Sequence, residues 1–437
     1  MNRKTRQGKL AAAAIASASA MLLTAACGGG SGGSGGSGGD GTVEIMYGFA
    51  QEQSDAFKAA MKPFLDEEGI KVKFSPTPDF DKLIRSRVAG NNTPDIAIFP
   101  QPGITLSIGR TGKLADLTTL SGYDAAVENV VPGIIDAATE DDKVYAAPMS
   151  ISVKSLVWYP KVAFEKAGYK VPTTQAELLA LTEQIKSDGT TPWCVGIESA
   201  AATGWPATDW MEDYVLRFGG TEGYDKWVKH EIPFNDPLVK EAADEIGKIW
   251  FTEGNVLGGR KAITANNFGT AANPMFESKP KCFLHRQASF LAQPGSFPAD
   301  VIEDLDARAG VFQLPPIEAE DPVSIMGGGD LAGLFSKDDA DSKKVLEYLI
   351  GPEFKGSPEQ GGFISPHTTY DLAQQPNETM KAISKIAYEA DNFRFDGSDS
   401  MPGEVGSGSF WRGMVGWVGG KSTDETLDTI EESWPTS

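Results

Sequence analysis

The chain has 437 residues and a formal net charge of −21, with 41% hydrophobic and 9% aromatic residues. This acidic balance argues against nucleic acid or an anionic membrane surface as a binding partner, since both are bound through clustered basic side chains. The length and the hydrophobic content are sufficient for two domains, each with its own core.

The first 40 residues predict an export signal and a tether. Basic residues between positions 3 and 9 precede an apolar segment at residues 10–26, which is typical of a secretory signal and too short for a confident transmembrane anchor. Residues 24–27, Thr-Ala-Ala-Cys, resemble the lipobox of bacterial lipoproteins, in which the signal (residues 1–26) is removed and the cysteine (Cys27) carries the lipid. The alternative is a plain secretory signal with an incidental thiol. Residues 27–40 then form a flexible Gly/Ser linker.

From residue 42 the sequence alternates predicted strands and helices. Strands are expected at residues 42–47, 71–74 and 95–99, with helices of 3.6-residue periodicity between them. A β-α-β-α-β order predicts a mostly parallel sheet with right-handed crossovers. Ligands bind beyond the carboxyl ends of strands in such sheets, which makes Phe49, Gln51, Glu52 and Gln101 candidate ligand residues.

The pattern changes near residue 150, where Ala147-Pro148 predicts a crossover to a second sheet. Strands are expected at residues 153–159 and after Pro192, and Thr174 with Glu177 predicts a capping box for a helix. Residues 311–316 predict the return crossing, and helices are expected near residues 380–390, 410–418 and 423–434. We therefore expect an α/β fold of two lobes, each a mostly parallel sheet flanked by helices, with a hinge between them. The first lobe takes residues 41–150 plus about 316–368, and the second takes residues 151–315 plus about 369–437.

Apart from Cys27, the chain contains two cysteines, Cys194 and Cys282. An even pair in an oxidising compartment predicts a disulfide, and the alternative is two buried free thiols. The three histidines lack the spacing of paired metal ligands, and the acidic run at residues 396–400 lacks the spaced glutamate of a calcium-binding EF-hand loop. We expect neither a metal site nor a cofactor.

Residues 155–178, SLVWYPKVAFEKAGYKVPTTQAEL, resemble a segment of the extracellular solute-binding proteins of ABC sugar importers, the family of maltose-binding protein. PDIAIF at residues 94–99, ADSKKVLEYLIGPE at residues 340–353 and the segment at residues 401–434 agree in order, so the resemblance covers essentially the whole chain after the linker. Residues 203–220 are similar to the α-glucoside and oligosaccharide subgroup. Pro160 and Gln175 depart from the family pattern, at positions away from the expected cleft.

The resemblance implies a two-lobed fold that binds a mono- or oligosaccharide, closes around it and presents it to an ABC permease without chemistry. It also implies a monomer at the outer face of the bacterial membrane, held there by its lipid anchor only. Two alternatives stay open. A lipid-anchored glycoside hydrolase needs two carboxylates about 5 to 10 Å apart, and no hydrolase signature accompanies the aspartates. A binding protein for a glycerol phosphodiester normally clusters arginines.

A sugar site combines flat aromatic side chains, which cover the apolar faces of a pyranose, with hydrogen-bonding groups for its hydroxyls. The resemblance places Trp411 on the sugar-stacking helix, although it also fits a core tryptophan. Trp205 and Asp209 are four residues apart and share one helix face, although Asp209 also fits a first-turn acid stabilised by the helix dipole. The candidate ligand residues are Phe49, Gln51, Glu52, Gln101, Lys154, Trp205, Asp209, Trp210, Gln287, Gly328, Asp330, Arg394 and Trp411.

Overall fold

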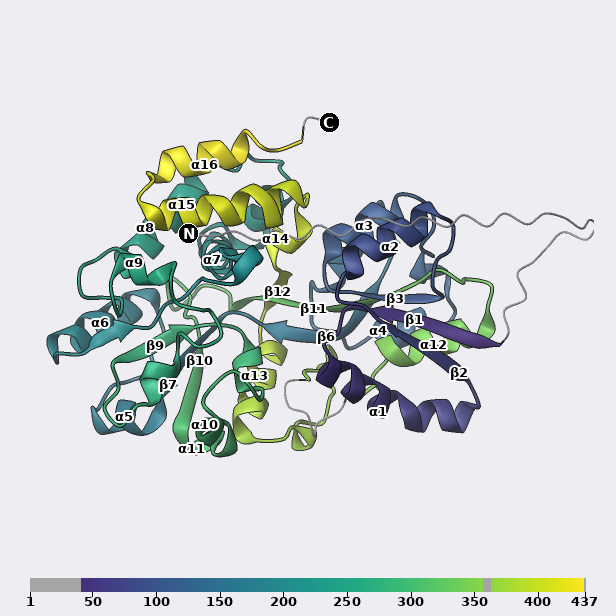
Figure 1. Ribbon diagram of the computed structural model, residues 1–437, viewed down its shortest axis with the longest axis horizontal. Coiled ribbons are helices and arrows are strands. Elements are labelled where there is room, and N and C mark those ends of the chain that lie inside the picture. Colours follow the sequence, from purple (N-terminus) through teal and green to yellow (C-terminus); the bar gives the residue numbers. More distant parts are fainter. Residues whose placement is uncertain (1–40, 357–362, 436–437) are drawn as a thin grey trace, which may run out of the picture. The chain divides into compact units, whose positions relative to one another are not determined.

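The computed structural model describes residues 41–356 and 363–435. The predicted export signal, Cys27 and the linker lie outside the described residues and stay predictions from the sequence. Gly41–Ser437 is one structural unit, and its strands form two main sheets (Figure 1).

The first sheet contains β1 (Thr42–Tyr47), β2 (Lys71–Pro76), β3 (Ile96–Phe99), β6 (Ala147–Val153), β11 (Ser324–Leu334) and β12 (Asn392–Phe395). Its order is β12-β11-β3-β1-β2, and β6 also pairs with β11. β1 pairs in parallel with β2 and β3, which confirms the three predicted strands and their direction. β11 runs antiparallel to β3 and β6 and parallel to β12.

The second sheet contains β7 (Leu156–Pro160), β8 (Thr191–Trp193), β9 (Cys282–Arg286) and β10 (Ala309–Gln313), in the order β10-β7-β9-β8. The α/β class and the two lobes are as predicted, but strand direction differs here. β10–β7 and β7–β9 are antiparallel, and β8–β9 is parallel. The segments that lead to β9 and to β10 contain several helices, and neither strand is joined to β7 by the single-helix crossover that enforces parallel pairing. A separate pair is formed by β4 (Thr139–Glu140) and β5 (Lys143–Val144).

Helices flank both sheets. In Figure 1, α1 lies on one side of β1–β3, and α2 and α3 lie on the other. The helices around the first sheet are α1 (Gln51–Glu68), α2 (Phe80–Ala89), α3 (Pro102–Gly109), α4 (Tyr123–Val127) and α12 (Ala340–Ile350). Those that follow the second-sheet strands are α5 (Lys161–Lys166), α6 (Gln175–Ser187), α7 (Trp205–Val228), α8 (Pro237–Trp250), α9 (Arg260–Ile263), α10 (Ala299–Glu303) and α11 (Leu305–Arg308). The C-terminal helices are α13 (Glu378–Tyr388), α14 (Gly397–Ser400), the π-helix Glu404–Phe410, α15 (Trp411–Gly419) and α16 (Thr423–Glu431).

Local signals fix several helix ends. α1 ends at Gly69, which adopts the left-handed conformation with φ 67° that glycine accepts without strain. Thr174 caps α6 by accepting a hydrogen bond from the amide of Glu177, as predicted. The Glu177 carboxylate, however, bonds to the amide and hydroxyl of Thr173, so only half of a capping box forms.

Three strands of the first sheet meet close to where the chain leaves it for the second lobe. Val153 of β6 and Phe395 of β12 both pair with Gly327 of β11. Residues 154–155 lead from β6 to β7, residues 314–323 lead from β10 to β11, and residues 396–398 lead from β12 into the C-terminal helices. We call these three segments the junction.

The sheet pairing also bears on the predicted lobe limits. β12 falls in the range that the sequence assigned to the second lobe, yet it pairs with β11 of the first sheet. Its four residues are too few to show a periodicity, and the parallel pairing with a strand almost 70 positions earlier decides its place. The predicted boundary at residue 150 is also wrong, because it falls inside β6, whose residues 151–153 pair with β11. The limits near residues 315 and 368 stay a prediction.

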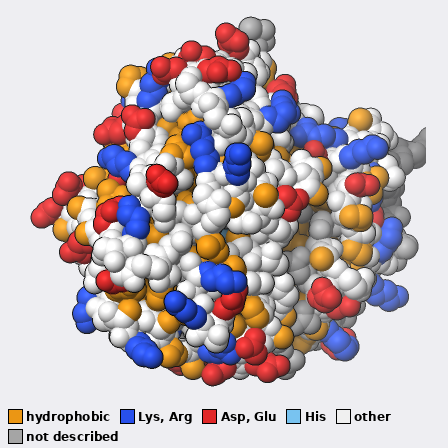
Figure 2. Space-filling view, turned by 60° about the vertical axis from the view of Figure 1, so that its left-hand side comes forward, with side chains coloured by type: hydrophobic (Ala, Val, Ile, Leu, Met, Phe, Trp, Pro, Cys, Tyr) orange, Lys and Arg blue, Asp and Glu red, His pale blue; other side chains and the backbone are white. Residues whose placement is uncertain are grey.

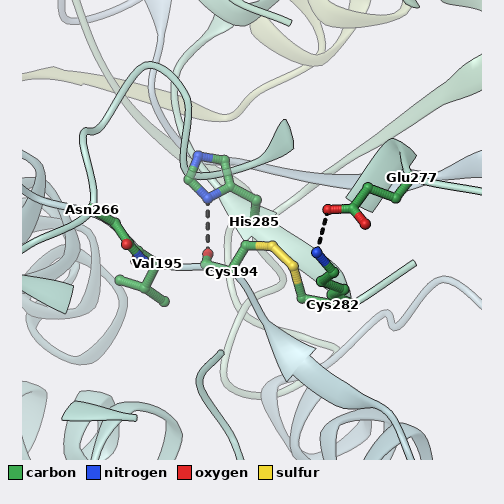
Figure 3. Close-up of a disulfide and its surroundings, with 7 residues drawn as sticks. Cys194, Val195, Asn266, Glu277, Cys282 and His285 are labelled. Atoms are coloured by element: carbon green, nitrogen blue, oxygen red, sulfur yellow. Dashed lines mark hydrogen bonds and ion pairs between the residues drawn. A yellow bond between two sulfur atoms is a disulfide. The ribbon is translucent and has the colours of Figure 1, made fainter. Parts of the chain in front are cut away.

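A disulfide joins Cys194 to Cys282, which lie 88 positions apart in sequence and whose Cα atoms are 5.6 Å apart (Figure 3). Both cysteines are buried, beside β8 and at the start of β9. His285 lies three residues after Cys282 in β9, and its Nδ1 is 2.9 Å from the carbonyl oxygen of Cys194. The bond therefore fastens the edge of the second sheet to its neighbouring strand.

Charged side chains of both signs are interspersed over the face shown in Figure 2, with no continuous basic area on it. Among the residues that the structure describes, no helix combines the length and the apolar character that a bilayer crossing needs.

Candidate ligand-binding site

Lys154 lies at the centre of a group of charged side chains at the junction. Its Nζ donates to Asp209 Oδ1 at 3.0 Å and to the carboxylate of Asp396. Asp209 belongs to the second turn of α7 and is fully buried, while the Lys154 side chain is 14% exposed. The structure therefore brings together two predicted ligand residues, Lys154 and Asp209, and adds a third group that follows β12.

Trp205, the first residue of α7, provides an aromatic surface next to this group. Lys154 Nζ lies 5.4 Å from the centre of the indole ring, within the range of a cation–π contact. The ring packs edge-on against Phe268 at 5.0 Å and lies 6.4 Å from Phe290. The Trp205 side chain is half-buried, so part of it stays accessible. Lys154 thus contacts both the partly accessible ring of Trp205 and the buried carboxylate of Asp209.

Gly204 brings Trp411 to the same region. A Cβ atom at Gly204 would lie 2.4 Å from the carbonyl oxygen of Trp411, and Gly204 has φ +118°. Only glycine satisfies both conditions, because it has no Cβ and accepts positive φ. The start of α7 therefore touches the start of α15, which directly follows the π-helix, and π-helical turns occur frequently at functional sites.

Two buried polar atoms of this region have no hydrogen-bond partner among the described residues, namely Asp209 Oδ2 and Trp411 Nε1. Arg286 Nη1 lies 3.5 Å from Asp209 Oδ2, close enough for charge attraction but not for a good hydrogen bond. Buried polar groups are usually satisfied, and unsatisfied ones often mark a functional position. One is an acceptor and the other a donor, which is what a hydroxyl group needs.

Burial and mutual charge shift the pKa values here. Burial lowers the pKa of Lys154, but the carboxylates of Asp209 and Asp396 outweigh it and hold the pKa well above its usual value. Burial raises the pKa of Asp209 to about 7, against the opposing effect of Lys154. Asp396 is buried too, yet the Lys154 ammonium lowers its pKa. Lys154 is thus a permanent cation, with Asp396 as its firmly ionised partner.

Of the four candidates at strand ends of the first lobe, Gln101 contacts the acidic run at residues 396–400. Gln101 directly precedes α3 without a side-chain capping bond, and its Nε2 donates to Asp399 Oδ1 at 2.7 Å. Phe49 packs on aromatic residues of its own lobe, including Tyr47 at 4.9 Å between ring centres. Gln51 and Glu52 are exposed in the first turn of α1 and have no contact with the charged group in the structure.

Trp210 is a correction to the predicted set. It is 2% exposed and packs between Trp193 and Trp250, at 5.4 and 5.2 Å between ring centres. The side chain belongs to the core of the second lobe because α7 is buried on all sides along residues 206–216. A ligand has no access to its ring.

Four further candidates are engaged elsewhere. The Gln287 side chain is buried and accepts from the amide of Ala288. Gly328 lies within β11, paired with Ser152, so its backbone is occupied by the sheet. Arg394 donates to both carboxylate oxygens of Asp225, at 2.7 and 3.0 Å. Asp330 accepts from the Ser150 hydroxyl at 2.7 Å, and burial raises its pKa to about 6.

Comparison with known proteins identifies the family of this chain. The family model of bacterial extracellular solute-binding proteins matches residues 50–356. The chain is 39% identical to the osmoprotective compounds-binding protein GgtB of Synechocystis, over 88% of this chain and 90% of that protein. It is 38% identical to the alpha-glucosides-binding periplasmic protein AglE of Rhizobium meliloti, over 90% of this chain and 87% of that protein.

The chain is a bacterial extracellular solute-binding protein.

Solved structures show the same fold at lower identity. The bacterial solute receptor AcbH superimposes with a TM-score of 0.75 at 18% identity, covering 91% of this chain and 96% of that one. RafE from Streptococcus pneumoniae superimposes with a TM-score of 0.71 at 18% identity, covering 91% and 98%. Both confirm the two-lobed architecture of a solute-binding protein for this chain.

Sequence reasoning missed three acidic members of the group. Glu212 lies one turn after Asp209 on α7, and Asp396 and Asp399 lie in the run at residues 396–400, which we compared only with calcium-binding loops. Oxygen atoms of Asp209, Glu212 and Asp396 lie within 4.8 Å of one another, a spacing that suits a cation. In the structure Lys154 supplies that positive charge. Three buried acids at positions i, i+3 and i+4 of an otherwise apolar helix segment, Asp209, Glu212 and Asp213, were the available signal.

Two surface hollows lie outside this region. One, of about 480 Å³, is lined by Asn273, Phe276 and Asp300 among others, and the second, of about 560 Å³, lies along α8 beside Phe218. None of the predicted ligand residues lines either hollow. The candidate site therefore depends on the residues at the start of α7, not on these hollows.

Proposed function

We propose that this solute-binding protein captures an α-glucoside or a related oligosaccharide outside the cell and delivers it to an ABC importer. The observation that carries the proposal is that Asp209 and Trp411, both near the start of α7, each keep a polar atom, Oδ2 and Nε1, without a hydrogen-bond partner among the described residues, while the ring of Trp205 is half-buried. A pyranose offers an apolar face for the ring and hydroxyls that both donate and accept. The names of the relatives AglE and GgtB, which concern α-glucosides and osmoprotective compounds, support the same ligand class.

The arrangement of the carboxylates supports binding without catalysis. A glycosidase holds two carboxylates about 5 Å or more apart, on opposite sides of the bond to be cleaved. Here one oxygen each of Asp209, Glu212 and Asp396 lies within 4.8 Å of the others, and Lys154 bonds two of them. Because Lys154 is bonded to both Asp209 and Asp396, neither carboxylate is free to flank a glycosidic bond. We therefore propose that the ligand is released unchanged.

A phosphodiester ligand is less well supported. Arg286 is 1% exposed in its side chain and donates to Asp213 Oδ2 at 2.6 Å, and Arg217 is bound to the same carboxylate. Neither guanidinium is free to clamp a phosphate. The nearest cation to the site, Lys154, already has two carboxylate partners.

We propose further that the protein is a monomer and that Cys27 carries the lipid that holds it to the outer face of the membrane, with the permease as its protein partner. A single acyl chain binds a membrane only marginally, so a diacylglyceryl group is the anchor that fits. Mass spectrometry of the N-terminal peptide from membrane fractions tests this. A peptide that begins at Cys27 with a diacylglyceryl mass is expected, and unmodified Cys27 in exported protein would contradict it.

Isothermal titration calorimetry with maltose, trehalose, sucrose and maltotriose tests the function. We expect saturable binding of at least one sugar and none of a glycerol phosphodiester. Asp209→Asn should weaken the binding, whereas Glu222→Gln, on the exposed side of α7, should leave it unchanged. An absence of heat with every sugar, or steady turnover of a chromogenic α-glucoside, would refute the proposal.

A further inference from the structure

Three carboxylates of α7 are fully buried and form one row, Asp209, Glu212 and Asp213. At spacings of three and four residues they project from the same side of the helix. Burying a charged group costs free energy unless partners compensate it, so each of these acids requires an explanation from its contacts. Each of the three acids forms a hydrogen bond with a residue of the junction.

The first junction segment, residues 154–155, meets two acids of the row. Lys154 Nζ donates to Asp209 Oδ1, and the Ser155 hydroxyl donates to Asp213 Oδ1 at 2.7 Å. The same hydroxyl accepts from the amide of Met326 in β11 at 2.8 Å. Ser155 therefore ties α7 to the strand that pairs with both β6 and β12.

The second segment, residues 314–323, is held through an arginine. Arg217 lies one turn after Asp213 and forms an ion pair with it. The guanidinium also donates to the carbonyl oxygens of Leu314 and, at 2.8 Å, Pro315. The ion pair with Asp213 thus fixes the orientation of the Arg217 guanidinium, which holds residues 314–323.

The third segment, residues 396–398, meets Glu212 directly. The amides of Gly397 and Ser398 donate to the two carboxylate oxygens of Glu212, at 2.9 and 3.2 Å. A Cβ at Gly397 would lie 2.9 Å from a methyl carbon of Val228 and 3.0 Å from the hydroxyl oxygen of Tyr224, both on α7, so this segment lies close against the helix. All three segments are therefore bonded to one helix, and the candidate site lies at the start of that helix.

We propose that Glu212 and Asp213 are positioning residues that couple the candidate site to the hinge. Neither side chain is open to a ligand. Glu212 holds the segment after β12, Asp213 holds the other two segments, and Asp209, one turn earlier, is the member of the row that keeps an oxygen, Oδ2, without a hydrogen-bond partner among the described residues. A ligand that binds Asp209 and Trp205 then acts on the same part of α7, before the kink at Gly220, that is bonded to all three segments. This coupling rests on the proposed function for its ligand, but the hinge geometry exists without one.

The test is Glu212→Gln in the full-length chain. The amide has the same shape as the carboxylate but offers one acceptor oxygen where two amides donate, so one bond to Gly397 or Ser398 is lost. Glu222→Gln is the matched control, because it is the same substitution at an exposed side chain just beyond the kink of α7 at Gly220, where the carboxylate pairs with Lys226. Ser155→Ala is the second variant, in case Glu212→Gln fails to fold.

The measured quantity is the distance between the two lobes, which would not change if Glu212 and Asp213 only stabilised the fold. Spin labels at Ser86→Cys on α2 and Ser187→Cys at the end of α6, in a chain carrying Cys27→Ser, report the distance by double electron–electron resonance. We expect a broader distance distribution in ligand-free Glu212→Gln and Ser155→Ala than in Glu222→Gln. We also expect sugar affinity about fivefold or more lower, because the coupling free energy is lost.

Distance distributions of both variants that coincide with that of Glu222→Gln would overturn the proposal, even if sugar affinity fell. If Glu212→Gln does not fold, Ser155→Ala decides by the same comparison. If the wild-type chain binds no sugar, the proposed function fails, while the ligand-free distributions still decide the role of Glu212 and Asp213.

Discussion

Two tryptophans five residues apart on α7 are expected to respond in opposite ways to replacement by alanine. Trp210 is enclosed in the core by Trp193 and Trp250, whereas Trp205 is half-buried at the start of the helix beside Lys154. Trp210→Ala should destabilise the fold by about 3–5 kcal/mol, as large-to-small changes of buried aromatic residues do. Trp205→Ala should cost much less stability and should act on the ligand.

The size of the ligand effect follows from area. An aromatic side chain buries about 150–250 Å² when fully covered. If a sugar covers about a quarter of that area on Trp205, the gain at about 25 cal/mol/Å² is roughly 1–1.6 kcal/mol. Because about 1.4 kcal/mol corresponds to a tenfold change in affinity, Trp205→Ala should weaken sugar binding about tenfold.

Urea unfolding and calorimetric titration of the two variants measure these effects side by side. The expected result is a lower unfolding free energy for Trp210→Ala and a higher dissociation constant for Trp205→Ala. The reasoning is refuted if Trp205→Ala retains wild-type affinity, or if both substitutions lower stability equally.

The remaining predictions concern a second aromatic residue, the disulfide and one carboxyl group. Trp411→Ala should weaken sugar binding tenfold or more in titration calorimetry. The affinity of Trp411→Phe, which keeps a ring but lacks the unsatisfied Nε1, should lie between those of the wild type and the alanine variant. Equal affinities in all three proteins would exclude a role in binding. Replacing Cys194 and Cys282 by alanine should lower stability by about 4–5 kcal/mol in the chain-entropy model for their 88-residue separation, seen as a lower Tm; two free thiols in exported protein would contradict the bond. Burial raises the pKa of Asp330 to about 6, from the 3.8 expected in the unfolded chain. The folded state therefore holds this proton more tightly, which stabilises the fold fully below pH 3.8, and the stabilisation is lost as the pH rises through about 6. Asp330→Asn should remove this decline, worth at most about 3 kcal/mol, and parallel stability profiles of variant and wild type between pH 4 and 7 would show otherwise.

The strands of the first lobe could be predicted because their periodicity is local. β1, β2 and β3 are short apolar or alternating runs bounded by turn residues, and the β-α-β order then fixes their parallel direction. The pairing of Cys194 with Cys282 was also accessible, since no other pairing remains once Cys27 is set aside. Directions in the second sheet were not accessible, because the long segments before β9 and β10 contain several helices, and no single crossover fixes how these strands pair with β7.

The distinction between Trp205 and Trp210 shows why the site was harder to predict. Residues 206–216 of α7 are buried on every side, so hydrophobic periodicity does not identify an inner face. Both tryptophans therefore suited a ligand site equally well. The contact that separates them is that of Lys154 with Trp205, which depends on tertiary packing.

Asp396 illustrates the second reason. Its carboxylate meets Lys154 across 242 positions of sequence, and nothing near Asp396 signals that contact. The run at residues 396–400 was compared with one local motif, the EF-hand loop, which it does not match. Its function in the structure is to supply an ion-pair partner and two backbone amides at the junction.

The charge balance of this region gives a reason for a neutral ligand that is independent of any relative. The region contains five carboxyl groups and three cationic side chains, so full ionisation would leave an excess of negative charge in a buried region. The carboxyl groups are those of Asp209, Glu212, Asp213, Asp396 and Asp399, and the cations are Lys154, Arg217 and Arg286. Burial, together with the neighbouring Asp396 carboxylate, raises the pKa values of Asp209, Glu212 and Asp399, which relieves part of this excess. An anion would restore the repulsion, and a cation would compete with Lys154 for its two carboxylates. A neutral polyhydroxylated solute needs only hydrogen bonds and an aromatic face, and Asp209 Oδ2, Trp411 Nε1 and Trp205 supply both.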